Sequence, residues 1–291
     1  MRKIALIGAY GQLSTDIRKV FDKNYFEIIP LTHQDIEITD FENVKKVLSP
    51  LNPEIVINTS AYHRVNEMED NREKAFLVNA EAEKNLAELC QSKNWTLVFI
   101  STDYVFGKDE KRNIPYKETD IAGPINVYGE SKLAGENFTR EICKKHFIIR
   151  SSGLFGVAGA SGKGGNFVEL MIRLGKEKGA VKVVNDQVLT PTYTKNIAEN
   201  MNELLKTENY GLYHVTSQGQ CSWYEFASEI FKLTKMNVKC SPVDSAHFST
   251  RAKRPKYSVL ENEALKKINL DLMREWKVNL KLYLQEKGHL E

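Results

Sequence analysis

The chain has 291 residues with a net charge of +3, 42% hydrophobic and 27% charged residues, which is typical of a globular protein with one large or two modest domains. The small charge, without a basic run interleaved with aromatic residues, argues against nucleic-acid binding, and no apolar stretch is long enough to span a membrane. The four scattered cysteines form no Cys/His cluster, so we expect reduced thiols, no metal site and a soluble cytoplasmic protein.

The chain begins with a short apolar run, residues 3–7, of the kind that forms a strand buried on both faces. A glycine turn follows directly, and residues 15–21 then have helical periodicity. Strand, glycine turn and helix are the context of a dinucleotide-binding fingerprint. Gly8 would make the tight turn, and Gly11 would let the backbone approach a pyrophosphate at the helix N-terminus. Ser14 occupies the third glycine position and weakens the match, so a tight turn without a ligand is the alternative.

Strands and helices alternate up to residue 150. We expect strands at 26–31, 55–59, 97–100 and 147–150, separated by helices at 41–48, 71–91 and 126–138. This alternation predicts an α/β fold with a Rossmann-type, doubly wound parallel sheet. No arginine directly follows the second strand to hold a 2′-phosphate, so both NADPH and NADH remain candidates. Glu37, in the loop after that strand, either accepts a hydrogen bond from an adenine amino group or is a solvated carboxylate.

Small and polar side chains follow the third and fourth strands, where open α/β sheets bind their ligands. Ser60 and Ala61 would let the backbone lie close beneath a cofactor. Thr102, at the end of the fourth strand, is a candidate to hydrogen-bond a reacting carbonyl oxygen. A strand-end hydroxyl bonded to the backbone is an equal alternative.

Tyr128 precedes Lys132 by four residues, so both side chains project from one face if the segment is helical. A phenol with its ordinary pKa of about 10 is a poor acid at neutral pH, and a neighbouring ammonium would lower that pKa. On spacing alone a solvent-facing pair is the commoner outcome. Together with the glycine turn and Thr102, the pair predicts hydride transfer between a nicotinamide and a carbonyl/alcohol pair, with Tyr128 exchanging the proton.

From about residue 151 the alternation ends, which predicts a smaller C-terminal α/β domain that binds the substrate. We expect helices at 166–174, 194–205, 223–233, 260–268 and 271–284, and strands at 181–184 and 211–215. The dinucleotide-binding domain would comprise 1–150, with 181–216 crossing back into it. The substrate domain would comprise 151–180 and 217–291.

Several sequence blocks carry a family resemblance along nearly the whole chain. They are Gly8-x-x-Gly11-Gln12-Leu13, Val56-Ile57-Asn58 with Ala61-Tyr62, Val78-Asn79-Ala80, residues 101–106, residues 126–136, Asn166-Phe167, Asp186-Gln187, Pro191-Thr192 and Arg254-Pro255. Through these blocks the chain resembles the extended short-chain dehydrogenases/reductases and, within them, the dTDP-4-dehydrorhamnose reductase family.

The resemblance implies NAD(P)H-dependent reduction of the 4-keto group of a nucleotide-diphospho-6-deoxysugar, as in dTDP-rhamnose and polysaccharide biosynthesis, with Thr102, Tyr128 and Lys132 as the catalytic residues. It implies cofactor contacts at Gly8, Gly11, Gln12, Leu13, Glu37, Ile38, Ser60, Ala61, Tyr62, Asn79, Tyr128 and Lys132. It implies substrate contacts at His63, Tyr104, Gly153, Asn166, Gln187 and Arg254. A homodimer is an arrangement that the sequence leaves open.

The chain departs from the family pattern in the expected pocket. His63 stands where the family usually has threonine, Asn66 where it has aspartate, and Gly153 where a tryptophan packs on the sugar. We therefore expect a changed pocket, with His63 either a titrating pocket residue or a packed neutral one. The alternative function is a non-catalytic subunit resembling the regulatory subunit of methionine adenosyltransferase. Epimerase or dehydratase chemistry fits less well. Dehydratases of this kind usually carry an acidic pair after the threonine, whereas here Asp103 is followed by Tyr104.

Overall fold

The computed structural model describes residues 1–159 and 165–290. Its larger lobe is built on strands β1 Arg2–Ile7, β2 Phe26–Leu31, β3 Ile55–Asn58, β4 Thr96–Thr102, β5 His146–Ser151 and β10 Gly211–His214. These strands form one parallel sheet in the order β10-β5-β4-β3-β1-β2. The chain reverses its direction of travel across the sheet between β1 and β3. The predicted doubly wound parallel sheet is therefore confirmed.

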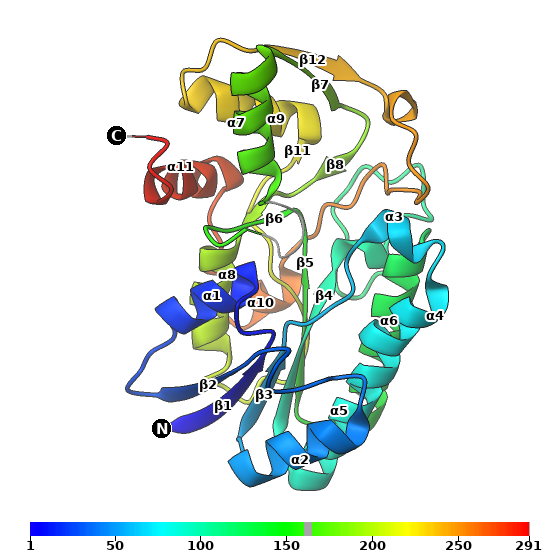
Figure 1. The fold of residues 1–291 in the computed structure, drawn as a ribbon, viewed down its shortest axis with the longest axis vertical. Helices are drawn as coiled ribbons and strands as arrows, with labels where there is room; N and C mark the ends of the chain where they lie inside the picture. The colour runs from blue at the N-terminus through cyan, green and yellow to red at the C-terminus, as the bar shows by residue number, and fades with distance from the viewer. Residues whose placement is uncertain (160–164, 291) are drawn as a thin grey trace.

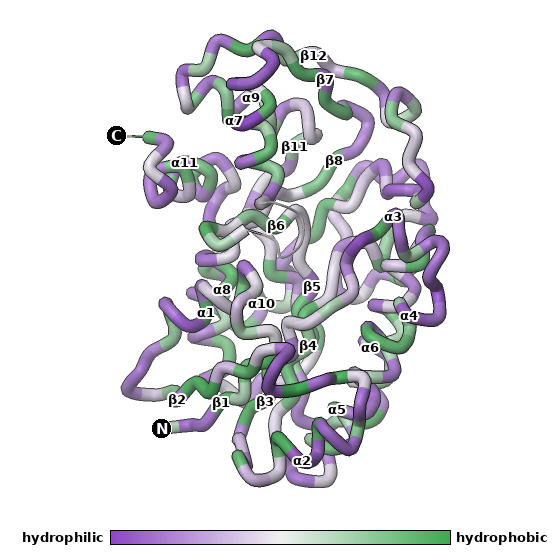
Figure 2. The backbone as a smooth tube through the Cα atoms, in the orientation of Figure 1, coloured by the Kyte–Doolittle hydropathy of each residue, from purple (hydrophilic) through white to green (hydrophobic). Residues whose placement is uncertain are grey.

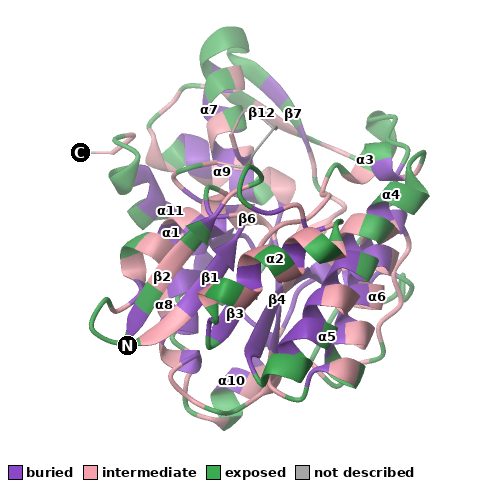
Figure 3. Ribbon diagram, turned by 60° about the horizontal axis from the view of Figure 1, so that its bottom comes forward, coloured by how far each residue is buried: buried purple, intermediate pink, exposed green. Residues whose placement is uncertain are grey.

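Helices cover both faces of this sheet (Figure 1). One face carries α1 Gln12–Val20, α8 Thr194–Leu204 and α10 Glu263–Lys267, and the other carries α2 Phe41–Leu51, α5 Ala82–Lys93 and α6 Val127–Ile142. Successive residues of β1 face opposite sides, so Ile4 and Leu6 enter one core while Ala5 and Ile7 enter the other. Figure 2 shows the hydrophobic stretches along the central strands, and Figure 3 shows these strands buried beneath helices with exposed outer faces.

The helix expected at 71–91 is interrupted rather than regular. It consists of α4 Arg72–Phe76, a π-helical turn Leu77–Glu81 and then α5, and a short helix, α3 Val65–Met68, precedes it. π-helical turns are frequent at functional sites because they turn a side chain out of its regular place. Here the turn contains Asn79.

The smaller lobe lies at the top of Figure 1. It contains helices α7 Phe167–Lys178, α9 Trp223–Leu233 and α11 Trp276–Glu286 and short strands β6 Leu154–Phe155, β7 Ala180–Val184, β8 Val188–Leu189, β9 Thr192–Tyr193, β11 Cys221–Ser222 and β12 Lys239–Val243. Its core is rich in aromatic side chains, including Phe155, Phe226 and Tyr283. Ser222 caps α9 in a capping box with Glu225: each side chain accepts a hydrogen bond from the backbone N–H of the other residue.

The expected crossing of the chain from residue 181 is wrong in its starting point. Strand β7 pairs with β12 in a separate two-stranded sheet, and Val181 and Val183 are buried in the core of the smaller lobe. The return to the larger lobe begins with α8, which packs on α1, and ends with β10 at the edge of the main sheet. The alternating apolar residues at 181–184 predict a strand. They do not indicate its partner, because β12 lies far away in the sequence.

The last two helices are shorter than expected, because their first residues are engaged in extended contacts. Leu260 forms a β-bridge with Tyr116, and Glu275 forms one with Gln218. Leu265 and Met273 pack into the core shared with α1 and α8. The C-terminal region therefore does not lie wholly in the smaller lobe.

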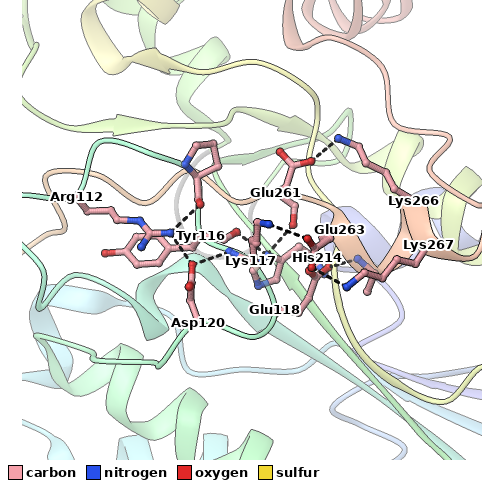
Figure 4. Close-up of polar contacts among 12 residues, drawn as sticks. Arg112, Tyr116, Lys117, Glu118, Asp120, His214, Glu261, Glu263, Lys266 and Lys267 are labelled. Atoms are coloured by element: carbon pink, nitrogen blue, oxygen red, sulfur yellow. Dashed lines mark hydrogen bonds and ion pairs between the residues drawn. The ribbon is translucent and has the colours of Figure 1, made fainter.

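A set of polar contacts fastens α10 to the edge of the main sheet (Figure 4). His214 Nδ1 lies 3.1 Å from the carbonyl oxygens of both Tyr116 and Glu261. Glu118 Oε1 accepts hydrogen bonds from the backbone N–H groups of His214 and Ala264. Strand β10, the loop before α6 and the start of α10 are thus joined at one place. None of the described helices combines the length and the hydropathy needed to cross a bilayer.

Candidate active site

The turn between β1 and α1 has the geometry of a phosphate-binding loop. Gly8 has a φ of +78°, and a Cβ there would lie 2.7 Å from Thr59 Oγ1. Gly11 begins α1 without a side-chain cap, and the first turn contains no acidic residue. The first backbone N–H groups of the helix, which have no intrahelical partner, are thus left for an anion. This part of the chain fits a dinucleotide pyrophosphate.

Ser14, at the third glycine position, holds α1 against the end of β3. Its hydroxyl lies 2.6 Å from Thr59 Oγ1, and the side chain is completely buried. The side chains of Gln12 and Leu13 turn toward the protein, since Gln12 Nε2 donates to Leu154 O at 3.4 Å and Leu13 lies in the core. The Leu13 side chain is therefore withdrawn from a bound pyrophosphate, which leaves the backbone N–H of this residue to meet it.

Asn79 fixes the loop after β3 instead of pointing freely into the site. Its Oδ1 accepts from Tyr62 N, and its Nδ2 donates to Tyr62 O, both at 2.9 Å. The same Nδ2 donates to Ser131 Oγ on α6 at 3.0 Å. Ser60 is held in turn by Asn58 Oδ1, which accepts from its backbone N–H at 3.0 Å. The backbone at Ser60, Ala61 and Tyr62 is therefore set in place before any ligand binds.

Glu37 and Ile38 are more engaged with the protein than the resemblance implies. Glu37 Oε1 accepts from Thr39 N at 3.0 Å and from Thr39 Oγ1 at 2.7 Å, which lowers the pKa of the carboxyl. The Ile38 side chain is buried in the core beside Leu31 and Val44. The backbone of Glu37 is engaged as well, since its N–H donates to Asn43 Oδ1 at 2.9 Å and its carbonyl accepts from Asp40 N at 3.1 Å. The contacts of Glu37 and Ile38 with a cofactor stay a prediction.

The structure brings Thr102, Tyr104 and Tyr128 together at the carboxyl end of β4. Thr102 lies close enough to Tyr128 for its hydroxyl to oppose the rise in the pKa of the phenol. The rings of Tyr104 and Tyr128 meet edge to face, with centroids 5.7 Å apart. Asn126 caps α6 by accepting from Gly129 N at 2.8 Å, so Tyr128 lies in the first turn of a well-started helix. A side chain at Gly129 would collide with the Tyr104 carbonyl, so α6 approaches this segment closely.

The expected lowering of the Tyr128 pKa by Lys132 is wrong for this structure. Burial of the phenol raises its pKa, and the charge of Asp103 adds to that effect. Lys132 is buried with its ammonium 3.8 Å from the centroid of the Phe99 ring. Burial lowers the lysine pKa, while the charges of Glu83 and Glu136 oppose that change. Sequence spacing gives the helical face of the pair but not the burial that sets its pKa values.

The substrate side of the site contains Gly153 and Arg254. Gly153 has a φ of +54°, and a Cβ there would lie 2.7 Å from Leu189 Cδ1 and 3.2 Å from Pro191 Cα. The Nε of Arg254 is buried without a hydrogen-bond partner in the described part of the chain. Its charge acts on Tyr104, whose pKa burial raises to about 12. His63 Nδ1 lies 3.2 Å from the carbonyl oxygen of Ala61.

The hydrogen bonds of the Asn166 side chain, and the position of Gln187, place both residues in the smaller lobe, apart from Thr102 and Tyr128. The Asn166 side chain caps α7 by accepting from Glu169 N, and its Nδ2 donates to Gly156 O at 2.9 Å and to the Tyr283 hydroxyl at 3.0 Å. Gln187 lies in the turn between β7 and β8. These contacts tie Asn166 to the smaller lobe, and its role at a substrate stays a prediction.

Asp103 is the residue of this site that the sequence does not single out. The buried carboxylate accepts hydrogen bonds from Thr102 Oγ1 at 3.1 Å, Ser152 Oγ at 2.8 Å and Ser258 Oγ at 2.6 Å. Burial raises the pKa of Asp103 to about 6. Its place beside Thr102 was the only local signal, because Ser152 and Ser258 are far away in the sequence. Within the described residues no group of three or more His, Cys, Asp or Glu side chains is arranged as a metal site.

The comparisons with known proteins agree along the whole chain. A family model described as the RmlD substrate binding domain matches residues 1–288. The chain is 35% identical to a spore coat polysaccharide biosynthesis protein of Bacillus subtilis, with 99% of each chain covered. It is 34% identical to the dTDP-4-dehydrorhamnose reductase of Aggregatibacter actinomycetemcomitans, covering 90% of this chain and 91% of the relative.

Solved structures of dTDP-4-dehydrorhamnose reductases are also similar to this chain. The dTDP-4-dehydrorhamnose reductase of Clostridium acetobutylicum superposes with a TM-score of 0.93 at 42% identity, covering 98% of this chain and 99% of the other. That of Bacillus anthracis, in complex with NADP, has a TM-score of 0.92 at 38% identity, covering 98% and 100%. A UDP-glucose 4-epimerase of Thermus thermophilus shares the fold at 17% identity. The chain therefore belongs to the RmlD family of extended short-chain dehydrogenases/reductases, the family of the dTDP-4-dehydrorhamnose reductases.

Proposed function

We propose that the protein reduces the 4-keto group of a dTDP-4-keto-6-deoxysugar, with hydride from NADPH or NADH. The main observation behind this proposal is that Thr102, Tyr104 and Tyr128 lie together at the carboxyl end of β4. Relatives that are 34% and 38% identical are named as dTDP-4-dehydrorhamnose reductases, and the second was crystallised with NADP. A role in polysaccharide biosynthesis follows from the same reaction and from the name of the Bacillus subtilis relative.

The chemistry needs one hydride and one proton. When bound, the nicotinamide supplies the hydride to the carbonyl carbon. Tyr128 supplies the proton to the alkoxide oxygen, and the raised pKa of its phenol keeps that proton in place at neutral pH. Lys132 follows one helical turn later on α6, where its ammonium would hold the nicotinamide ribose.

Arg254 supports an anionic substrate. A buried guanidinium N–H without a partner is costly, so this geometry favours an acceptor supplied from outside the chain. Arginine matches phosphate oxygens well because its N–H groups form a planar fork. We assign the diphosphate of the sugar nucleotide to Arg254, with Tyr104 beside the sugar.

Gly153 indicates that the protein surface facing the sugar differs from that of relatives with a tryptophan at this position. Leu189 and Pro191 approach the Cα of Gly153 and occupy the space above it. Aliphatic contact then replaces a flat aromatic face. We propose that the enzyme accepts a keto sugar other than, or in addition to, the rhamnose precursor. A cytoplasmic location, with the four cysteines as free thiols, is consistent with a reaction that consumes NAD(P)H.

Tyr128→Phe tests the mechanism, because it removes the transferable proton and little else. We expect turnover to fall about 100-fold or more, with cofactor affinity unchanged. NAD(P)H oxidation gives turnover, and quenching of protein fluorescence gives cofactor binding. Tyr25→Phe is the matched control, since Tyr25 is exposed and precedes β2, at the opposite end of the strands from the site. Unchanged turnover in Tyr128→Phe would refute the mechanism. Cofactor binding without turnover of any keto sugar by the wild type would favour a regulatory subunit.

A further inference from the structure

Glu83 is a buried carboxylate that the proposed reaction does not use. It lies on α5, and none of its surface is exposed. Its Oε2 accepts a hydrogen bond from Asn58 Nδ2 at 2.7 Å, and its Oε1 accepts one from the Thr139 hydroxyl on α6 at 3.3 Å. Burial raises the pKa of Glu83, while the charge of Lys132 opposes that rise. A carboxylate is costly to bury without such partners, so the two hydrogen bonds are what hold it here.

The Asn58 side chain, at the end of β3, has one orientation that satisfies both of its ends. Its Nδ2 donates to the Glu83 carboxylate, and its Oδ1 accepts from the backbone N–H of Ser60 at 3.0 Å and from the Ser60 hydroxyl. A carboxylate oxygen accepts and a backbone N–H donates, so an amide turned by half a revolution would lose its contacts with both. Glu83 and Ser60 together therefore fix the Asn58 side chain.

Ser60 begins the segment 60–62, where the family resemblance places the cofactor. Asn79 holds the other end of this segment through the backbone of Tyr62. At the Ser60 end the same task falls to Asn58, which is itself buried. Without Glu83 the Asn58 Nδ2 would be left buried and unpaired, which is costly enough to favour a turn of the side chain toward another acceptor. That turn would release Ser60.

We propose that Glu83 is a positioning residue for the cofactor: it fixes the Asn58 side chain, which in turn holds Ser60 and the cofactor-facing backbone in place before binding. This inference rests on the proposed function, because it takes the segment 60–62 as part of the NAD(P)H site. A protein without this pairing would have to order the segment as the cofactor binds, and that cost lowers the affinity.

Cofactor affinity tests the proposal without any keto sugar. Titration of the protein into NADH and into NADPH, followed by the fluorescence of the nicotinamide, gives a Kd for each. Glu83→Leu removes both acceptors at similar volume, so we expect the Kd to rise about tenfold. Glu83→Gln keeps an acceptor for Asn58 and a partner for Thr139, so its Kd should stay within about twofold of the wild type. Loss of affinity in Glu83→Gln would overturn the proposal, whether or not Glu83→Leu folds.

Two further variants separate a role through Asn58 from a general role in packing α5 against α6. Thr139→Val removes only the other contact of Glu83, so the Kd should stay within about twofold of the wild type. Asn58→Ala should raise the Kd as much as Glu83→Leu does, and the double variant should raise it no further. An equal rise in Thr139→Val, or additive rises in the double variant, contradicts the proposal.

Turnover supplies a second readout. With a keto sugar that the wild type reduces, Glu83→Leu should raise the cofactor KM and largely keep kcat at saturating cofactor. A fall in kcat with an unchanged cofactor KM contradicts the positioning role. A wild type that binds a cofactor but reduces no sugar refutes the proposed reaction alone, and the Kd comparison still decides the role of Glu83. A wild type that binds neither NADH nor NADPH refutes both.

Discussion

Gly153 illustrates how one residue limits the shape of the pocket. Its left-handed backbone and the nearby Leu189 and Pro191 leave no room for a side chain. The missing aromatic face is therefore tied to the local path of the backbone. Restoring a tryptophan there would require the loop around Leu189 to move.

Gly153→Ala should lower the free energy of unfolding by about 2–4 kcal/mol. About 1–2 kcal/mol comes from the left-handed conformation, and the remainder comes from the contact with Leu189. Gly179→Ala is the matched control, since Gly179 has a φ of +63° and nothing within 4 Å of its would-be Cβ. Urea unfolding measures both variants. Equal losses would show that the space beside Leu189 is not restrictive.

For single residues, the sequence predicts which side chains react but not how the fold shifts their pKa values. Tyr104 and Tyr128 meet at the end of β4, with Thr102 beside Tyr128. The expected direction of the Tyr128 pKa shift is wrong because burial of the phenol raises its pKa, and burial depends on the whole fold. Asp103 was overlooked for a related reason, since two of its three donors come from distant segments.

Helix α6 is unusual as an element because its inner face is polar. Ser131, Lys132, Glu136 and Thr139 are all buried, and each acts on a neighbouring element. Glu136, for example, pairs with Arg150 on β5, and Ser131 accepts from Asn79. Apolar periodicity locates most of the helices in this chain, but it cannot show that this face is buried. The start of the helix is set by Asn126, whose side chain caps it.

Asn126→Ala should affect both stability and turnover. It removes the cap of α6 and the bond from Asn126 Nδ2 to Lys253 O at 2.8 Å, so we expect a loss of about 1–2 kcal/mol. Turnover should fall as well, because Tyr128 lies in the first turn. Ser222→Ala is the control, a cap lost from α9 at about 1 kcal/mol with turnover kept. Thermal unfolding and NAD(P)H oxidation measure the two effects, and equal turnover in both variants would contradict the argument.

Across the whole molecule, contacts between segments distant in sequence determine the strand pairing and the packing of the C-terminal segment, which local sequence patterns do not predict. The alternation of strands and helices predicts the parallel sheet, and the structure has it. The pairing of β7 with β12 and the return of Leu265 to the main core depend on partners distant in sequence. His214 belongs to this level, because it links β10 to the loop at Tyr116 and to Glu261 before α10.

The pH dependence of the free energy of unfolding should reveal the lowered pKa of His214. Burial and the charge of Arg150 lower its pKa to about 3 in the folded protein, against about 6.5 in the unfolded chain. Between these values the unfolded chain binds a proton that the folded protein does not, so stability falls as pH decreases. Relative to His214→Gln, the wild type should lose about 1.4 kcal/mol per pH unit below pH 6. The comparison cancels the opposite contribution of Asp103, whose raised pKa acts alike in both proteins. Parallel curves from urea unfolding would refute this assignment.

The most direct test of the account is oxidation of NADPH and of NADH, measured in parallel, with a panel of dTDP-4-keto-6-deoxysugars. We expect turnover of at least one sugar by the wild type, loss of that turnover in Tyr128→Phe, and retention of cofactor binding in the variant. Turnover that survives in Tyr128→Phe would contradict the assignment of the proton donor. Cofactor binding without oxidation across the panel would contradict the proposed reaction.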